Sequence, residues 1–224
     1  MEAAASLQLV LALGHAESFA REDFIAGPSN AAALALIDRW PDWPGRIIAL
    51  VGEEGAGKSH LAAAWGEKSG ARFLSGRVLD DADLPAALST GALVVEDLTP
   101  PWFDEVTLFH LLNLAQQQGA YLLLTARWSP TLWPVSLPDL NSRLRALPVV
   151  SVAPPDERLL RALMLKLAAD RQIELDDNVV NFVLARIERS FAGVQQAVAQ
   201  LDREALRQKR PVSRALAAEL LRTP

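Results

Sequence analysis

The segment "GEEGAGKS", residues 52 to 59, constrains the fold more than any other part of the sequence. It matches the pattern G-x-x-x-x-G-K-[ST], follows the apolar run "RIIALV", and opens a helical pattern that extends from about Lys58 to Lys68. Glycines allow the backbone to fold closely around phosphate oxygens and to point its N–H groups at them, at the positive end of a helix. The sequence therefore predicts a phosphate-binding loop between a buried strand and a helix.

Individual residues of this loop have distinct expected roles. Lys58 is placed to pair with the β- and γ-phosphates, and Ser59 is placed to ligate Mg²⁺. The backbone that surrounds the phosphates is expected to come from Gly52, Gly55, Ala56 and Gly57. ADP or ATP with Mg²⁺ is the ligand that this pattern predicts.

A second acid is expected at the end of a neighbouring strand, where it holds the water shell of the metal. The run "ALVVED", residues 92 to 97, offers Glu96 and Asp97 there, and the sequence does not decide which of the two is used. Two solvated turn residues are the alternative interpretation. Thr125, in "YLLLTA", is a candidate polar group for the γ-phosphate, although threonine is common at strand ends. We predict a metal site of Ser59, Glu96 and Asp97, and catalytic roles for Asp97 and Thr125.

Apolar runs alternate with helical patterns through the first two thirds of the chain. Predicted strands cover 46–52, 92–97, 121–126 and 147–152, and predicted helices cover 27–40, with Ser29 or Asn30 as its cap, 58–68 and 104–118. This alternation is typical of an α/β fold with a parallel sheet and helices on both faces. After Pro154 and Pro155 only helical patterns follow, within 156–170, 175–189, 191–208 and 212–222. We expect an α/β domain over 21–154, a small all-α domain over 155–224 and a leader over 1–20.

The charge distribution limits the classes of function. The net charge is −5, with 10 Lys and Arg against 17 Asp and Glu in residues 1–154 and 12 against 10 in residues 155–224. Such a balance argues against non-specific DNA binding, which needs a clearly basic face. The chain has no cysteine and no apolar run near the roughly 18 residues of a membrane span. We expect a cytoplasmic protein without a thiolate metal site.

The N-terminal stretch "LQLVLALGH", residues 7 to 15, has three interpretations. It is short and apolar, as in an export signal, but Glu2 precedes it and no Lys or Arg occurs before Arg21. It could also be a strand or helix packed on the core. The third interpretation, which we favour, is an exposed peptide that docks on another protein, because alternate residues of an extended chain point the same way.

Together these residues resemble the DnaA-related branch of the AAA+ ATPases, and within it the Hda-type regulators of replication initiation. The segment "FIAGPSN", residues 24 to 30, resembles the family segment that lies along the adenine, which implies nucleotide contacts for Phe24 and Ile25. "GEEGAGKSHLAAAWGE" resembles the family's phosphate loop and adds His60 to the nucleotide set. "SLPDLNSRL", residues 136 to 144, resembles the stretch that carries an arginine finger, with Arg143 at the finger position.

The resemblance also implies partners. Hda-type proteins carry a leader peptide that docks on the replicative sliding clamp, and "QLVLAL" fits it through Gln8, Leu9, Leu11 and Leu13. The clamp-bound protein then prompts DnaA to hydrolyse its ATP, which switches initiation off. No segment resembles the helix-turn-helix domain of DnaA, so no sequence-specific DNA binding is expected. The resemblance implies a bacterial protein at the nucleoid or replisome.

Some positions depart from the family pattern. The first acid of the strand-end pair is usually Asp, whereas Glu96 stands here, and the longer side chain suggests slow intrinsic hydrolysis. An arginine of the third lid helix aligns with Ala192, and Arg189 is a candidate substitute. Arg143 could also be a solvated arginine at a helix end, and Arg127 and Arg145 fit the finger position less well.

Two other functions stay open on the sequence. One is an autonomous ATPase that loads or remodels a replication protein, with residues 7–15 structural. The other is a nucleotide-gated adaptor that recruits partners without hydrolysis. The sequence leaves the oligomeric state open, including assembly with further copies of the same chain.

Overall fold

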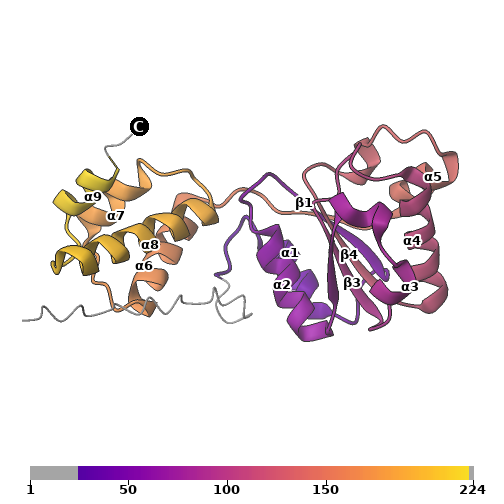
Figure 1. The fold of residues 1–224 in the computed structure, drawn as a ribbon, viewed down its shortest axis with the longest axis horizontal. Helices are drawn as coiled ribbons and strands as arrows, with labels where there is room; N and C mark the ends of the chain where they lie inside the picture. The colour runs from indigo at the N-terminus through magenta and orange to yellow at the C-terminus, as the bar shows by residue number, and fades with distance from the viewer. Residues whose placement is uncertain (1–24, 222–224) are drawn as a thin grey trace, which may run out of the picture.

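Five parallel strands form the centre of the computed structural model, which describes residues 25–221 (Figure 1). The strands are β1 (Ile47–Val51), β2 (Arg72–Ser75), β3 (Ala92–Glu96), β4 (Tyr121–Ala126) and β5 (Val149–Ser151). Their order across the sheet is β2-β3-β4-β1-β5. The predicted parallel sheet is confirmed, and the four predicted strands are present, β4 with the predicted bounds and the other three slightly shorter. Crossover helices are required because each strand must return to the same edge before the next begins.

Helices cover both faces of the sheet (Figure 1). One face, here called the α2 face, packs against α1 (Ala31–Arg39) and α2 (Lys58–Ser69). The other, here called the α4 face, packs against α4 (Glu105–Gln118) and α5 (Pro138–Ala146). Strand residues alternate between the faces, so that Val94 and Leu123 join the core on the α2 face and Leu93 and Leu124 the core on the α4 face.

Aromatic rings fill part of the α2 face. Trp65 of α2 is fully buried and stacks on Trp43, with ring centroids 4.9 Å apart. The indole N–H of Trp43 donates to the carbonyl of Leu36 over 2.7 Å, which ties it to α1. Tyr121, at the start of β4, meets the Trp43 ring edge-on. These contacts fix the two helices at the end of the sheet where β4 begins, opposite the end that carries the phosphate loop.

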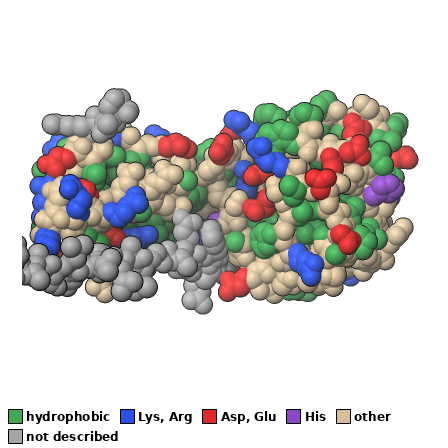
Figure 2. Space-filling model, viewed as in Figure 1, with side chains coloured by type: hydrophobic (Ala, Val, Ile, Leu, Met, Phe, Trp, Pro, Cys, Tyr) green, Lys and Arg blue, Asp and Glu red, His purple; other side chains and the backbone are tan. Residues whose placement is uncertain are grey.

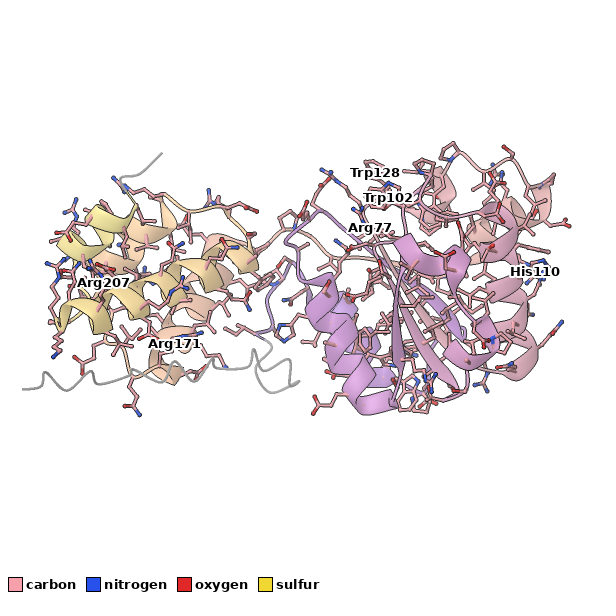
Figure 3. The ribbon with its side chains drawn as sticks, in the orientation of Figure 1. Arg77, Trp102, His110, Trp128, Arg171 and Arg207 are labelled. Atoms are coloured by element: carbon pink, nitrogen blue, oxygen red, sulfur yellow. The ribbon has the colours of Figure 1, made fainter. Side chains whose placement is uncertain are left out.

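The segment between α2 and β3 was not predicted from the sequence. It contains the edge strand β2, the 3₁₀ segment η2 (Gly76–Asp81) and the short helix α3 (Leu84–Ala87). Three of the four residues of β2 are exposed, so this strand lacks the alternation that marks a half-buried strand. Arg77 of η2 lies over the ring of Trp102, with its guanidinium carbon 3.8 Å from the ring centroid, and so joins the loops that follow β2 and β3 (Figure 3).

The C-terminal part consists of four helices with a core of their own. They are α6 (Glu157–Asp170), α7 (Asp177–Leu184), α8 (Phe191–Gln208) and α9 (Arg214–Leu220). An Asp or Ser side chain caps each of them, from Asp156, Asp176, Ser190 and Ser213. This confirms the predicted four-helix region, although α7 is shorter than the periodic pattern over 175–189.

The first helix begins at Ala31, directly after Asn30, which is one of its two predicted caps. Neither predicted residue, however, caps the helix through its side chain. The buried side chain of Asn30 instead accepts from the N–H of Gly27 over 2.8 Å and donates to the carbonyl of Ile25 over 3.1 Å. Asn30 therefore fixes the segment before the helix, because its amide satisfies that segment's backbone groups instead of the helix's.

The molecular surface carries both signs of charge. Acidic and basic side chains are interspersed on the face in Figure 2, and no continuous basic surface forms there. Between residues 25 and 221, no helix has both the length and the apolar character that crossing a bilayer requires.

Candidate functional site

The predicted phosphate loop connects β1 to α2 at the end of the sheet that lies nearer the four C-terminal helices α6 to α9, here called the lid (Figure 1). Gly55 and Gly57 have φ angles of 74° and 95°, in the left-handed region that favours glycine. Gly57 is the residue before α2, and no side chain caps that helix. Each of the four C-terminal helices, by contrast, has a side-chain cap. The first N–H groups of α2 therefore lack a side-chain acceptor, which fits an anionic ligand.

Lys58 folds back onto its own loop. Its ammonium donates to the carbonyls of Gly52 and Glu53 over 2.8 Å and 2.9 Å, and its side chain is buried. Burial lowers the pKa of Lys58 below its usual range, while the nearby carboxylates of Asp97, Glu53 and Glu54 oppose that shift. A phosphate would supply the negative charge that this buried ammonium lacks, so the loop fits a nucleoside polyphosphate.

The C-terminal helical part closes directly onto the loop. A Cβ atom at Gly55 would lie 2.6 Å from the Cβ of Ser190, and one at Gly57 would lie 3.0 Å from the ring of Phe191. The N–H of Phe191 points to the carbonyl of Gly55 over 3.5 Å. The starts of α2 and α8 therefore meet at the loop. These contacts leave no room for side chains at Gly55 and Gly57, a constraint that their positions in the motif alone did not reveal.

The predicted acids lie beside the loop. Glu96 ends β3 and follows the alternation of Val94, which places it on the α2 face, with Ser59 in the first turn of α2. Asp97 has left the strand with a φ of 54°, is exposed, and acts electrostatically on Lys58. Glu96 is half-buried and Ser59 exposed. In residues 25–221 no three His, Cys, Asp or Glu side chains form a metal-binding group. A Mg²⁺ ion held by these acids would therefore need other oxygen ligands, such as the Ser59 hydroxyl, phosphate oxygens and water.

Thr125 is close to the acids but its hydroxyl is already engaged. Its side chain is fully buried, and its Oγ1 accepts from the N–H of Asp97 over 3.0 Å. The Thr125 carbonyl accepts from the N–H of Leu98 over 2.8 Å. Thr125 thus fixes the turn after β3, and its predicted contact with a γ-phosphate stays a prediction.

Arg127 is a cation beside the loop that was not predicted as part of the nucleotide site. It follows β4, and its Nε and a terminal nitrogen contact one carboxylate oxygen of Glu53 over 2.8 Å and 2.7 Å. It is also the arginine whose charge lowers the pKa of Lys58. Its neighbour Trp128 lies in Figure 3 on the side of the sheet domain nearer the lid. The available signal was its place two residues after Thr125, because parallel strands end at the same edge.

Arg143 lies elsewhere. It is in the last turn of α5, on the α4 face, where a terminal nitrogen donates to Oε1 of Gln116 over 2.7 Å. Its guanidinium carbon is 5.3 Å from the ring centroid of Phe109. Arg145 is exposed, and Arg143 is half-buried. Because α5 packs on the α4 face and α2 on the opposite face, the predicted finger is separated from the start of α2 in the same chain.

The other predicted residues divide between the site and its surroundings. Ile25 packs against the core of the C-terminal helices, next to the segment that Asn30 fixes. Ala56 is buried, and His60 is half-buried in the first turn of α2. Ala192 is exposed at the start of α8, and Arg189 pairs with Glu157 over 3.0 Å, within the helical part. Phe24 and the predicted docking residues Gln8, Leu9, Leu11 and Leu13 lie outside the described residues.

Sequence comparison relates both parts of the chain to replication proteins. Residues 156–221 match the family described as "Hda, lid domain". The chromosomal replication initiator DnaA of Thermomicrobium roseum is 27% identical over 227 residues, which cover 90% of this chain and 49% of that protein. The chain therefore spans about half the length of that relative. An uncharacterized protein of Haemophilus influenzae is 29% identical over 174 residues, 71% of this chain and 74% of its own length.

Structural comparison agrees on the fold. Domain III of the replication initiation protein DnaA of Thermotoga maritima matches with a TM-score of 0.74 at 20% identity, over 92% of this chain and 97% of that domain. The AMPPCP-bound DnaA of Aquifex aeolicus matches with a TM-score of 0.69 at 16% identity, over 86% of this chain and 67% of that one. These likenesses establish that the chain has the fold of DnaA domain III, with the residues that match the lid family at its C-terminal end.

Proposed function

We propose that this chain, a DnaA-related AAA+ protein with an Hda-type lid, is a negative regulator of replication initiation. It binds ADP or ATP at the phosphate loop and attaches to the sliding clamp through Gln8 to Leu13. From there it inserts Arg143 into the ATP site of DnaA and stimulates hydrolysis of the ATP bound to that partner. It acts in the bacterial cytoplasm, at the replisome.

The phosphate loop supports nucleotide binding. The helix that follows the loop begins without a side-chain cap, and the ammonium of Lys58 is buried in the loop. Ser190 and Phe191 cover the loop. These features suit a nucleoside diphosphate or triphosphate. Ser59 and Glu96 would hold Mg²⁺, with Asp97 as the alternative acid. The metal would neutralise charge between the terminal phosphates. With Arg189 paired to Glu157 and Ala192 at the family's arginine position, the lid offers little to distinguish ATP from ADP.

The position of Arg143 is the observation that carries the proposal. Its guanidinium is held by α4 residues on the α4 face, whereas α2, which begins at Lys58, packs on the opposite face of the sheet. An arginine in that place is better suited to the ATP of a neighbouring molecule than to its own. Arginine fingers stabilise charge that develops on the γ-phosphate and accelerate hydrolysis about 10³- to 10⁵-fold in other nucleotide switches.

The test measures release of phosphate from DnaA loaded with radiolabelled ATP, in the presence of clamp on DNA. The unaltered chain is expected to accelerate this release, and Arg143→Ala is expected to remove the acceleration while still binding ADP. Arg145→Ala, two residues away and exposed, is the matched control and should behave as the unaltered chain. Full activity of Arg143→Ala would reject the finger.

Clamp attachment has its own test. Immobilised clamp should retain the unaltered chain and lose a Gln8→Ala, Leu11→Ala variant. If both are retained equally, residues 8–13 are not the clamp-binding peptide, and the role of Arg143 can still be tested separately. If Arg143→Ala keeps its activity while removal of residues 1–13 abolishes it, the protein works as an adaptor that tethers DnaA.

Intrinsic ATP hydrolysis is the second candidate function, and the position of Asp97 next to the phosphate loop favours it. This exposed carboxylate acts on Lys58 and lies beside the loop, where it could orient a water molecule. The purified chain would then hydrolyse ATP by itself and lose that activity in Lys58→Ala. Rapid turnover that needs neither clamp nor DnaA would favour an autonomous ATPase over the regulator.

A further inference from the structure

The contacts of Arg143 involve one face of α4. Phe109 and Gln116 are seven residues apart, which places them two helical turns apart on the same side of the helix. The ring of Phe109 lies beneath the guanidinium, and the amide oxygen of Gln116 accepts from one terminal nitrogen. In the described part of the chain Arg145 has no such contacts. Arg143 is thus the arginine of α5 whose head group has a defined position.

We infer that Phe109 and Gln116 are positioning residues for the arginine finger, an inference that rests on the proposed function. A free arginine side chain samples many rotamers, and ordering it during catalysis costs free energy. Phe109 and Gln116 order it beforehand. A guanidinium has five N–H donors, and the contact with Gln116 uses one of them, so the others stay available for the phosphate of a partner.

The helix that carries these residues is itself fixed relative to α5. The carboxylate of Glu105, in the first turn of α4, accepts from the N–H groups of Ser136 and Leu137 over 2.7 to 3.0 Å. These two residues come directly before α5, whose start has no side-chain cap of its own. Glu105 therefore holds one end of α5, and Gln116 contacts its other end through Arg143. Two connections at opposite ends define the angle at which the finger leaves the surface.

Gln117 provides a matched control. It is the next residue of α4, has the same side chain and is also exposed, but it lines a shallow groove toward α3 together with His110 and Asp83. Figure 3 shows His110 at the end of the molecule farthest from the lid. A change of Gln117 to leucine therefore repeats the chemistry of a change at Gln116 without touching Arg143.

The experiment compares Gln116→Leu, Gln117→Leu, Phe109→Leu and Phe109→Tyr in the DnaA assay with clamp on DNA. The maximal rate of phosphate release and the concentration for half-maximal stimulation are determined separately. Side-chain ¹⁵N relaxation of Arg143 Nε in the purified chain reports, without any partner, how ordered the guanidinium is. Thermal unfolding verifies that each variant is folded.

Gln116→Leu and Phe109→Leu should each lower the maximal rate about threefold to tenfold, which corresponds to the ordering of one long side chain. The half-maximal concentration should not change, and Arg143 should become more mobile. Gln117→Leu, and Phe109→Tyr, which keeps the ring, should match the unaltered chain.

Three results would overturn the inference. The first is full activity of Gln116→Leu and Phe109→Leu in an assay where Arg143→Ala is inactive. The second is an equal loss in Gln117→Leu, which would indicate a general effect on α4. The third is full activity of Arg143→Ala itself, which rejects the finger of the proposed function as well. The relaxation data then distinguish a finger that is ordered but unused from one that is not ordered.

Discussion

The two faces of the sheet differ in what they place at the protein surface. The α2 face leads to the phosphate loop, where Lys58 is buried among carbonyl oxygens and acidic neighbours and the lid covers it. The α4 face carries Arg143 at the end of α5, where it is half-buried against α4. One of its N–H groups donates to Gln116, and its other donors are available for a partner. One face leads to the predicted nucleotide site, and the other presents a charge outward. This separation is what the proposed function requires, because there the predicted finger acts on the nucleotide of another molecule.

The largest effect is expected in the core of the α2 face. Trp65→Ala removes a fully buried ring that stacks on Trp43, and the free energy of unfolding should fall by about 3–5 kcal/mol. Denaturant unfolding measures it. Trp128→Ala, at a half-exposed indole, should change it by less than about 0.5 kcal/mol. Equal losses would mean that the packing of the α2 face is not what holds α2 and its loop in place.

Removal of the ammonium at the phosphate loop has the next largest effect. Lys58→Ala should weaken ADP binding about 10- to 150-fold, the range expected for a lost charge-assisted hydrogen bond. Calorimetric titration measures the dissociation constant. Lys68→Ala, at the exposed other end of α2, should leave it unchanged. Unaltered ADP affinity in Lys58→Ala would contradict the assignment of the site to this face.

Arg127 tests the charge balance of the loop. Arg127→Ala leaves Glu53 without its partner beside incoming phosphates, so ADP affinity should fall about threefold to tenfold. The combination Arg127→Ala, Glu53→Gln should recover most of it, because the unpaired carboxylate is gone. Binding that stays weak in the double variant would show that Arg127 contacts the phosphate itself. Arg145→Ala, in α5, is the control.

The pH dependence of the loop follows from the pKa of Lys58, which burial lowers from 10.5. Below 10.5 and above the lowered pKa, the folded chain holds fewer protons than the unfolded chain, so the contribution of Lys58 to the free energy of unfolding rises with pH. ADP affinity should change in the opposite direction and fall by at most about tenfold per pH unit, because phosphate binds the charged ammonium.

Titration calorimetry from about pH 7 to about pH 10 checks this dependence. Lys58→Arg keeps its charge throughout that range and should lose the dependence, if it binds ADP. An affinity that is constant with pH in the unaltered chain would show that Lys58 does not titrate in contact with the nucleotide.

The sequence predicted the parts of the fold whose signals are local. β1, α2 and the phosphate loop followed from a glycine motif between a β-branched run and a helix, and α8 has the bounds that its pattern predicted. β2 was missed because an exposed edge strand has no alternation. Asn30, one of the two predicted caps of α1, does precede the helix, but its side chain satisfies backbone groups before the helix instead of capping it.

The candidate site divides in the same way. Lys58 was predicted from the phosphate-loop motif, and Glu96 and Asp97 were predicted from their place at the end of β3. Arg127 was noted only as a weak finger candidate, although its contact with Glu53 makes it part of the nucleotide site. The cover by Ser190 and Phe191 could not be predicted, because it joins segments more than 130 residues apart whose approach depends on how the lid is docked.

The sequence alone determined that the chain forms a parallel α/β domain with a phosphate loop and a separate helical part. Those features depend on local periodicity and on the conformational freedom of a few glycines. Only the tertiary structure decided which face each functional residue occupies. Arg127 and Arg143 are the same residue type, but the crossover connections place one beside Lys58 and the other at the end of α5, in contact with α4, on the α4 face of the sheet. Strand order and helix packing are long-range properties, and they separate the predicted nucleotide site from the predicted finger.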